Sequence, residues 1–147
     1  MIDQSDMVGP FCFGDWPAAG VPAVAAGIYA IWDDVRLLYV RMSGRGRSRQ
    51  DLADAEGSRR KVGLWTRLNS HASGRRSGDQ FCVYVPDRPV LPTLTAGRIE
   101  SIAAGATRMD DLVRAIVRDQ MSCRFAITVN GRAPPRSTGS CAQERSE

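Results

Sequence analysis

Two short segments rich in β-branched and aromatic residues place the strongest constraint on the fold. The segments Gly27–Trp32 and Arg36–Met42 are separated by an acidic turn, a pattern that predicts two antiparallel strands joined as a hairpin. A three-residue loop at Asp33–Val35 would place Tyr29 directly opposite Tyr39. A register that differs by one residue would send the two rings to opposite faces of the sheet, and the sequence leaves both registers open.

The segments after the hairpin predict an α+β fold. Residues Val62–Ala72 have helical spacing, because their apolar side chains recur at every fourth residue. Further on we expect a strand at Phe81–Val85, helices at Thr95–Ala104 and Met109–Gln120, and a last strand at Cys123–Val129. The order β-β-α-β-α-α-β corresponds to a small, mostly antiparallel sheet of three to four strands flanked by helices.

The chain of 147 residues is long enough for one globular domain. Residues 1–22 lack a clear period and predict a lead-in that lies on the core through Phe11, Phe13 and Trp16. We expect the domain itself to span residues 23–130, with a mobile basic loop at 43–61 that contains one short helical turn at 51–56. Residues 131–147 are rich in Pro, Ser and Gly, which predicts a disordered or truncated tail.

Positive charge is concentrated in one segment of the chain. Ten basic and three acidic residues lie between Arg41 and Arg76, so this segment has a charge of +7 and the rest of the chain −3. All but one of the basic residues are arginines, whose planar guanidinium matches phosphate oxygens better than a lysine ammonium does. This pattern favours a polyanionic partner, nucleic acid first, with a solvated loop in an arginine-rich proteome as the open alternative.

Several other function classes are excluded by composition. No apolar run approaches the roughly 20 residues that span a bilayer, and we expect no membrane partner. The four cysteines, Cys12, Cys82, Cys123 and Cys141, lie at no metal-ligand spacing, and the chain has one histidine. The first residues are acidic where a secretory signal would be basic. We therefore expect a cytoplasmic protein without a structural zinc site.

The hairpin also contains two spaced tyrosine motifs. The first strand contains Gly27-Ile28-Tyr29, and the second contains Tyr39-Val40-Arg41 ten residues later. The expected helix that follows contains Arg67 and His71 on one face. Together with the expected third strand, this order of motifs resembles the GIY-YIG nuclease family.

The resemblance covers residues 24–130. The run Leu68–Phe81 is similar to a bacterial branch of the family. The resemblance implies metal-assisted hydrolysis of a DNA phosphodiester by an endonuclease, with DNA as the partner and branched or damaged DNA among the candidate substrates. The sequence does not indicate an oligomeric state.

The resemblance assigns roles to five residues. Gly27 would allow close backbone packing, Tyr29 would deprotonate or orient the attacking water, and Tyr39 would bind the phosphate or support that water. Arg67 would neutralise charge that develops on the phosphoryl oxygens, and His71 would assist proton transfer or position Tyr29. Because a free tyrosine titrates near pH ~10, Tyr29 as a base would need nearby cations, such as Arg67 or a metal, to favour the phenolate.

Six further polar residues are candidates for nucleic-acid contacts: Arg41, Arg45, Arg47, Asn69, Arg75 and Arg76. Arg41 stands where the second family motif ends in Gly, so its side chain either folds outward or fills the phosphate site. The family holds one divalent metal, usually Mg²⁺, with a Glu on a later helix. Here Asn130-Gly131 leads into a segment with two prolines, which oppose a helix. We therefore expect Mg²⁺ as cofactor but identify no metal ligand.

Three hypotheses remain open at this point. The first is an endonuclease, active or weakened by the loss of the metal-binding Glu. The second is a catalytically silent module of the same fold that binds nucleic acid. The third is an interaction domain whose arginine-rich loop contacts an acidic protein.

Overall fold

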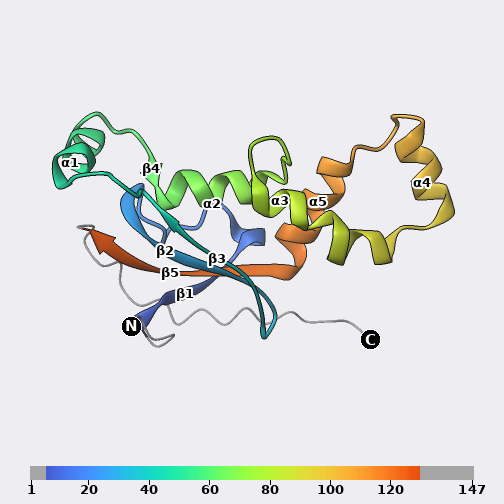
Figure 1. Cartoon of the computed structure of the whole chain (residues 1–147), viewed down its shortest axis with the longest axis horizontal. Coiled ribbons are helices and arrows are strands. Elements are labelled where there is room, and N and C mark those ends of the chain that lie inside the picture. The colour runs from blue at the N-terminus through green and yellow to red at the C-terminus, as the bar shows by residue number, and fades with distance from the viewer. Residues whose placement is uncertain (1–5, 130–147) are drawn as a thin grey trace.

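The computed structural model describes residues 6–129 and contains one mostly antiparallel sheet with helices against it (Figure 1). Its strands are β1 (Val8–Cys12), β2 (Val24–Asp33), β3 (Arg36–Ser43), β4 (Val62–Gly63) and β5 (Met121–Val129). The sheet order is β1-β5-β2-β3, and the short β4 pairs in parallel with β2. The expected α+β class is confirmed.

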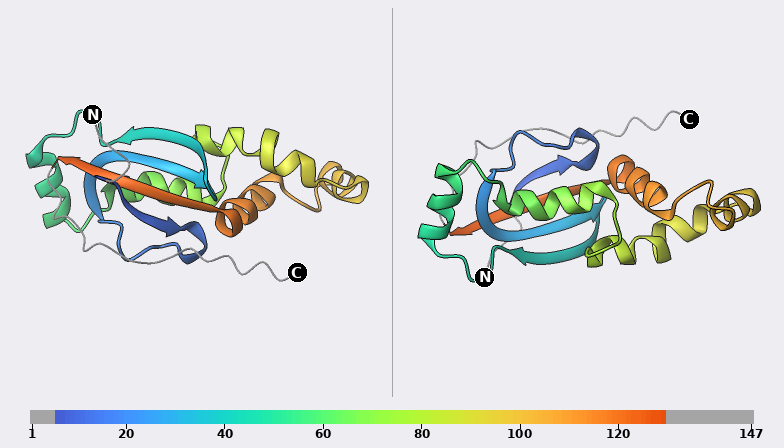
Figure 2. Two further views of the ribbon diagram at one scale, coloured as in Figure 1. Left: turned by 90° about the horizontal axis from the view of Figure 1, so that it is seen from below. Right: turned by 90° about the horizontal axis from the view of Figure 1, so that it is seen from above.

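The main helices are α1 (Arg49–Gly57), α2 (Leu64–Ser73), α3 (Gln80–Tyr84), α4 (Ala96–Ala103) and α5 (Met109–Gln120). Three short turns of other helix types are η2 (Phe13–Asp15), η3 (Pro86–Val90) and η4 (Leu91–Thr93). Helix α2 lies across one face of the sheet, while α1 and α4 lie at opposite ends of the molecule (Figure 2). None of the helices among residues 6–129 is long and apolar enough to cross a membrane.

Strands β2 and β3 form the expected hairpin, but its turn has two residues rather than three. Asp33 pairs with Arg36 across Asp34 and Val35. Asp34 has a φ of 52°, a left-handed conformation that aspartate adopts more readily than most residues. Of the registers that the sequence left open, the one set by a three-residue loop at Asp33–Val35 is therefore not the one observed.

A one-residue bulge in β3 determines on which face of the sheet Tyr39 lies. Leu38 has no partner in β2, because the residues on either side of it pair with consecutive residues of β2. Without the bulge, Tyr39 would pair with Ala30 and its ring would point away from Tyr29. In the structure Tyr39 pairs with Ile31. The two tyrosines therefore lie on the same face as diagonal neighbours, not directly opposite one another.

The segment Phe81–Val85, expected as a strand, is helical. The Asp79 carboxylate accepts a hydrogen bond from the backbone N–H of Cys82 at 3.3 Å and so caps α3. The first, second and fifth residues of the segment are buried, and the third and fourth are exposed, which is a helical spacing. A run this short cannot be assigned to helix or strand by its period alone, and the expected order β-β-α-β-α-α-β is wrong here.

Regular structure also occurs in two segments where we expected little. Val8–Cys12, in the expected lead-in, is the edge strand β1 and pairs with β5, while Phe11, Phe13 and Trp16 pack into the core as expected. The expected loop at 43–61 contains the nine-residue α1, which begins with a reciprocal capping box between Ser48 and Asp51. Residues 131–147 lie outside the described residues.

The face of the sheet that contains Tyr29 packs against α2. Leu64, Leu68 and Ala72 are buried along one side of α2, at the predicted i, i+4 and i+8 positions. Gly27 lies where this helix and β5 come closest to β2, since a Cβ atom there would collide with the carbonyl oxygen of Ala126 and lie 3.0 Å from Leu64 Cδ1. The lack of a side chain at Gly27 therefore allows α2 and β5 to pack this close to β2.

The close approach at Gly27 predicts the effect of one methyl group. Gly27→Ala should lower the free energy of unfolding by about 1–3 kcal/mol, because rigid backbone must move to admit the Cβ atom. Urea unfolding followed by circular dichroism measures the change. Gly97→Ala on α4 is the matched control, because a Cβ atom there has no neighbour within 4 Å. Equal stability of the two variants would contradict the packing argument.

Candidate active site

A buried chain of three hydrogen-bonded side chains lies between the sheet and α2. The Tyr29 hydroxyl lies 2.7 Å from Nε2 of His71, and Nδ1 of His71 lies 2.7 Å from Oδ2 of Asp79. Each of the three side chains is 1% exposed. A carboxylate can only accept, so Nδ1 donates its proton to Asp79 and Nε2 accepts the hydroxyl proton of Tyr29. The arrangement places a potential base directly behind a phenol.

Burial affects the pKa of Tyr29 more than the nearby positive charges do. Burial raises the pKa of Tyr29 above its ordinary value, with a smaller contribution from Tyr39, and the positive charges of Arg67 and Arg41 only partly oppose this. The two arginines thus act in the expected direction, but their effect is smaller than that of burial. Nε2 of His71 is a direct acceptor for the Tyr29 proton.

Asp79 remains ionised in spite of its burial. Burial alone would raise the pKa of Asp79, but the hydrogen bond and charge of His71, with further hydrogen bonds from Ser70 and the Cys82 backbone, lower it overall. An ionised Asp79 can stabilise the positive charge that His71 acquires when it accepts a proton.

Aromatic packing surrounds His71. The Tyr39 ring lies 6.4 Å from the Tyr29 ring and 5.9 Å from the His71 ring, measured between centroids. Phe81 packs edge-on against His71 at 5.0 Å and contacts Tyr39 at 5.3 Å. These rings hold the imidazole in one orientation and exclude water from its hydrogen bonds.

Arg41 lies on the solvent side of these rings. It pairs with Tyr29 in the hairpin register, and its Nε donates a hydrogen bond of 3.1 Å to the Tyr39 hydroxyl. A terminal nitrogen of Arg41 also donates to the side-chain oxygen of Gln80. The sequence left open whether Arg41 folds outward or fills the phosphate site. The side chain is exposed but stays beside the site through these hydrogen bonds, so its charge is available to an anion there.

Arg67 lies one turn before His71 on α2, where it faces solvent and lines a polar cavity of about 310 Å³. Its positive charge still acts at Tyr29, where it opposes the rise in the pKa. The other lining residues are Ser43, Gly44, Arg47, Gly63 and Thr66. No acidic side chain lines this cavity, and two guanidinium groups do. Its lining is therefore suited to an anion such as a phosphate.

The structure places the other nucleic-acid candidates away from this site or in structural contacts. Asn69 accepts a hydrogen bond of 2.9 Å from the indole N–H of Trp16, which is a packing role. Arg76 forms an ion pair of 2.7 Å with Asp110 on α5. Arg45 and Arg75 are exposed in loops.

One group of potential metal ligands occurs among residues 6–129. Ligand atoms of His71, Asp79 and Cys82 lie within 4.8 Å of one another, all buried. Both nitrogens of His71 and the Asp79 carboxylate already have hydrogen-bond partners, and the Cys82 thiol lies 3.6 Å from the backbone oxygen of His71. Burial raises the pKa of Cys82 to about 12, so the thiolate that a metal needs is disfavoured. This group does not fit the expected Mg²⁺, which prefers oxygen ligands in octahedral geometry.

The role of Asp79 was not among the predictions from the sequence. An Asp directly before a short apolar run is a helix-start signal, and it could have indicated both α3 and the position of the carboxylate. Its contact with His71 could not have been found in this way, because it depends on how the loop between α2 and α3 closes.

Comparisons with known proteins do not identify a relative. No family model, no curated protein and no solved structure matches this chain.

The buried carboxylate predicts a pH-dependent stability difference. Asp79→Asn should lower the free energy of unfolding at neutral pH by about 1–3 kcal/mol. Because the folded-state pKa of Asp79 lies below its ordinary value of 3.8, its stabilising effect is complete above that value and is lost as the pH falls through the folded-state pKa. The difference between wild type and Asp79→Asn, measured by urea unfolding at several pH values, should shrink in acid.

The matched control for this prediction is Asp15→Asn, since Asp15 is exposed in the link between β1 and β2. It should cost little stability at any pH. A wild-type advantage over Asp79→Asn that stayed constant from neutral pH into acid would contradict the role of the ionised carboxylate.

Proposed function

We propose that this protein is an endonuclease that hydrolyses phosphodiester bonds in DNA, with Tyr29, His71 and Asp79 as its proton-transfer chain. The observation that supports this best is the buried hydrogen-bond chain itself, which lies beside the exposed Arg41. Buried polar networks are costly unless every member is satisfied. A phenol backed by an imidazole and a carboxylate is also the arrangement that activates a proton acceptor or nucleophile.

The proton path follows from the direction of the two hydrogen bonds. As water attacks phosphorus, its proton moves to the Tyr29 oxygen while the Tyr29 proton moves to Nε2 of His71. Asp79 then stabilises the imidazolium, and the proton leaves later to the departing oxygen or to solvent. No free phenolate accumulates, which agrees with the raised pKa of Tyr29. General base catalysis of this kind contributes about 10²–10⁴-fold.

The substrate phosphate would be held by groups beside this chain. Tyr29 is 1% exposed, so the groups around it must move before water and phosphate can reach it. Arg41 is exposed, and it can exchange its hydrogen bonds to Tyr39 and Gln80 for phosphate oxygens. Arg67 then stabilises the negative charge that develops during the reaction.

Mg²⁺ remains the cofactor that the family resemblance implies. Since the group of potential ligands at His71, Asp79 and Cys82 does not fit Mg²⁺, no step of this proposal passes through a protein-bound metal. The proposed roles belong to Tyr29, His71, Asp79 and the neighbouring arginines.

Tyr29→Phe provides the most direct test. The variant keeps the ring but removes the hydroxyl, so the rate of nicking of a supercoiled plasmid in Mg²⁺ or Mn²⁺ should fall by about 10²–10⁴-fold. Arg67→Ala should lower it by about 10²–10³-fold, since one preorganised donor to the developing charge is lost. The control is Arg98→Ala on α4, which removes an exposed arginine far from the site and should cleave like wild type. Cleavage that persisted in both Tyr29→Phe and Arg67→Ala would exclude this site as the catalytic centre.

A catalytically silent module that binds nucleic acid is the second candidate. The cavity with Arg47 and Arg67 favours anion binding, and the sequence after Asn130 departs from the family's metal-binding helix because it contains two prolines. Intact DNA binding without cleavage in any divalent ion would support this candidate, and turnover would dismiss it.

Both candidates predict the same salt dependence of binding. The logarithm of duplex affinity should fall by about 0.9 per neutralised phosphate for each decade of salt. Replacing both Arg47 and Arg67 with Gln should reduce that slope by about 2, because each arginine contributes one contact. Fluorescence anisotropy with a labelled duplex measures it. An affinity insensitive to salt would instead favour the third hypothesis, an acidic protein partner.

A further inference from the structure

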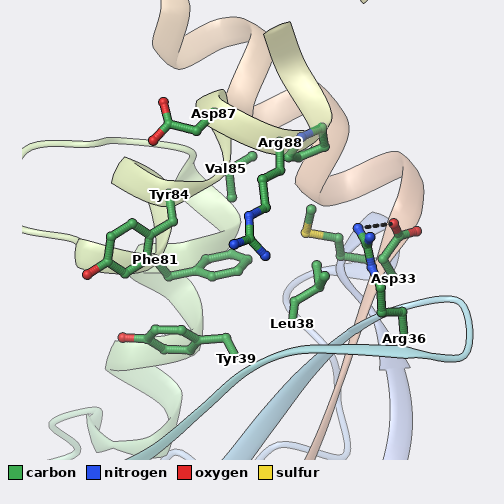
Figure 3. A pocket seen from close by; sticks show the side chains of 11 residues that line it. Asp33, Arg36, Leu38, Tyr39, Phe81, Tyr84, Val85, Asp87 and Arg88 are labelled. Carbon is green, nitrogen blue, oxygen red and sulfur yellow. Dashed lines mark ion pairs between the residues drawn. The ribbon is translucent and has the colours of Figure 1, made fainter. Parts of the chain in front are cut away.

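A second cavity, of about 370 Å³, lies beside Tyr39 toward the turn of the hairpin (Figure 3). Its lining includes three aromatic rings, those of Tyr39, Phe81 and Tyr84, and two arginines, Arg36 and Arg88. The proposed proton-transfer chain uses none of these five side chains. The cavity therefore offers a binding surface next to the site but separate from it.

The three rings come from two elements, Tyr39 from β3 and Phe81 and Tyr84 from α3. Tyr39 and Phe81 pack at 5.3 Å, and Phe81 is 3% exposed, which makes this wall rigid. Tyr84 on α3 is 52% exposed, and its hydroxyl lies 3.0 Å from the side-chain nitrogen of Gln80. Gln80 in turn accepts a hydrogen bond from Arg41. A continuous set of contacts therefore joins the outer wall of the cavity to the cation beside the site.

The charges around the cavity favour an aromatic ligand attached to an anion. Arg88 extends its guanidinium toward the rings in Figure 3, and it forms no ion pair with any residue in the described part of the chain. Arg36 is paired at 3.6 Å with Asp33, and both are partly exposed. The Asp87 carboxylate points away from the rings in Figure 3. One unpaired cation thus faces an aromatic wall.

We propose that this cavity binds an unpaired nucleobase of the DNA substrate, adjacent to the phosphate at Arg41. The inference rests on the proposed nuclease function and adds a substrate class to it, namely DNA with an unstacked nucleotide at a flap, bulge or junction. The cavity volume suits one base but not a duplex. Stacking on aromatic side chains is favourable for every base, and Arg88 can bind the adjoining phosphate. Tyr39 links the two sites, since its ring lines the cavity and its hydroxyl binds Arg41.

The test is a binding measurement with 2-aminopurine, whose fluorescence is quenched when it stacks on an aromatic ring. The probe is an oligonucleotide duplex with one unpaired 2-aminopurine, titrated with the full chain without divalent ions so that cleavage does not interfere. Wild type should quench the unpaired probe. Tyr84→Ala should reduce the quenching and weaken binding of this DNA by about 5- to 150-fold, and Arg88→Gln should weaken binding while the quenching remains.

Three controls separate stacking from damage to α3. Tyr84→Phe keeps the ring and should bind and quench like wild type. Val83→Ala shortens an exposed neighbour on the same helix and should also behave like wild type. A fully paired duplex of the same sequence should bind wild type and Tyr84→Ala equally. Unchanged affinity of Tyr84→Ala for the unpaired probe, or an equal loss for the paired duplex, would overturn the inference.

The proposed function and this inference fail in different ways. Cleavage of paired and unpaired DNA at equal rates, without quenching, would leave the nuclease function intact and remove the base-binding cavity. Quenching that depends on Tyr84, without cleavage of any DNA, would support the cavity and remove the nuclease function.

Discussion

The hydrogen bonds that join Tyr29, His71 and Asp79 connect three separate parts of the fold: β2, α2 and the start of α3. All three side chains are buried, so an unpaired member would cost about 1–3 kcal/mol. Helix α2 can therefore occupy only the position on the sheet that keeps both bonds. The absence of a side chain at Gly27 permits that position, because β5 and α2 come close to the strand there. The geometry of the candidate site and the packing of the core are thus parts of one constraint.

The bulge at Leu38 determines whether the ring of Tyr39 lies on the same face of the sheet as Tyr29. The motif order indicated the hairpin and both tyrosines, but not the face on which Tyr39 lies. Leu37, Leu38, Tyr39 and Val40 are all apolar or aromatic, so the run has no alternation from which a register could be deduced. The register was decided instead by the two-residue turn and by the packing of Tyr39 on His71 and Phe81. Such packing involves residues that are distant in the sequence.

The difference between a local sequence pattern and contacts between distant segments explains which elements could be predicted. Helix α5 was predicted at Met109–Gln120, where the structure has it, because its apolar period is long and two aspartates begin it. The buried stripe of α2 was predicted for the same reason. Strand β1 was missed because it is short and exists through pairing with β5, more than a hundred residues away in the sequence. Asp79 was missed as a site residue because its contact with His71 depends on a loop. Local pattern predicts elements, whereas contacts between distant segments complete the site.

If the proposed function holds, the two cavities would divide recognition between the phosphate backbone and an unpaired base. Tyr39, Arg41 and Ser43 are every second residue of β3, so their side chains lie on the same face. From Tyr39 to Ser43 the strand is about 14 Å long. Tyr39 lines the aromatic cavity, Ser43 lines the cavity with Arg47 and Arg67, and Arg41 lies between them. Guanidinium groups bind phosphates of any sequence, and aromatic rings stack on any base that is free to leave its helix. A nucleic-acid strand laid along β3 would therefore be selected for an unpaired nucleotide next to the buried proton acceptor, and not for its sequence.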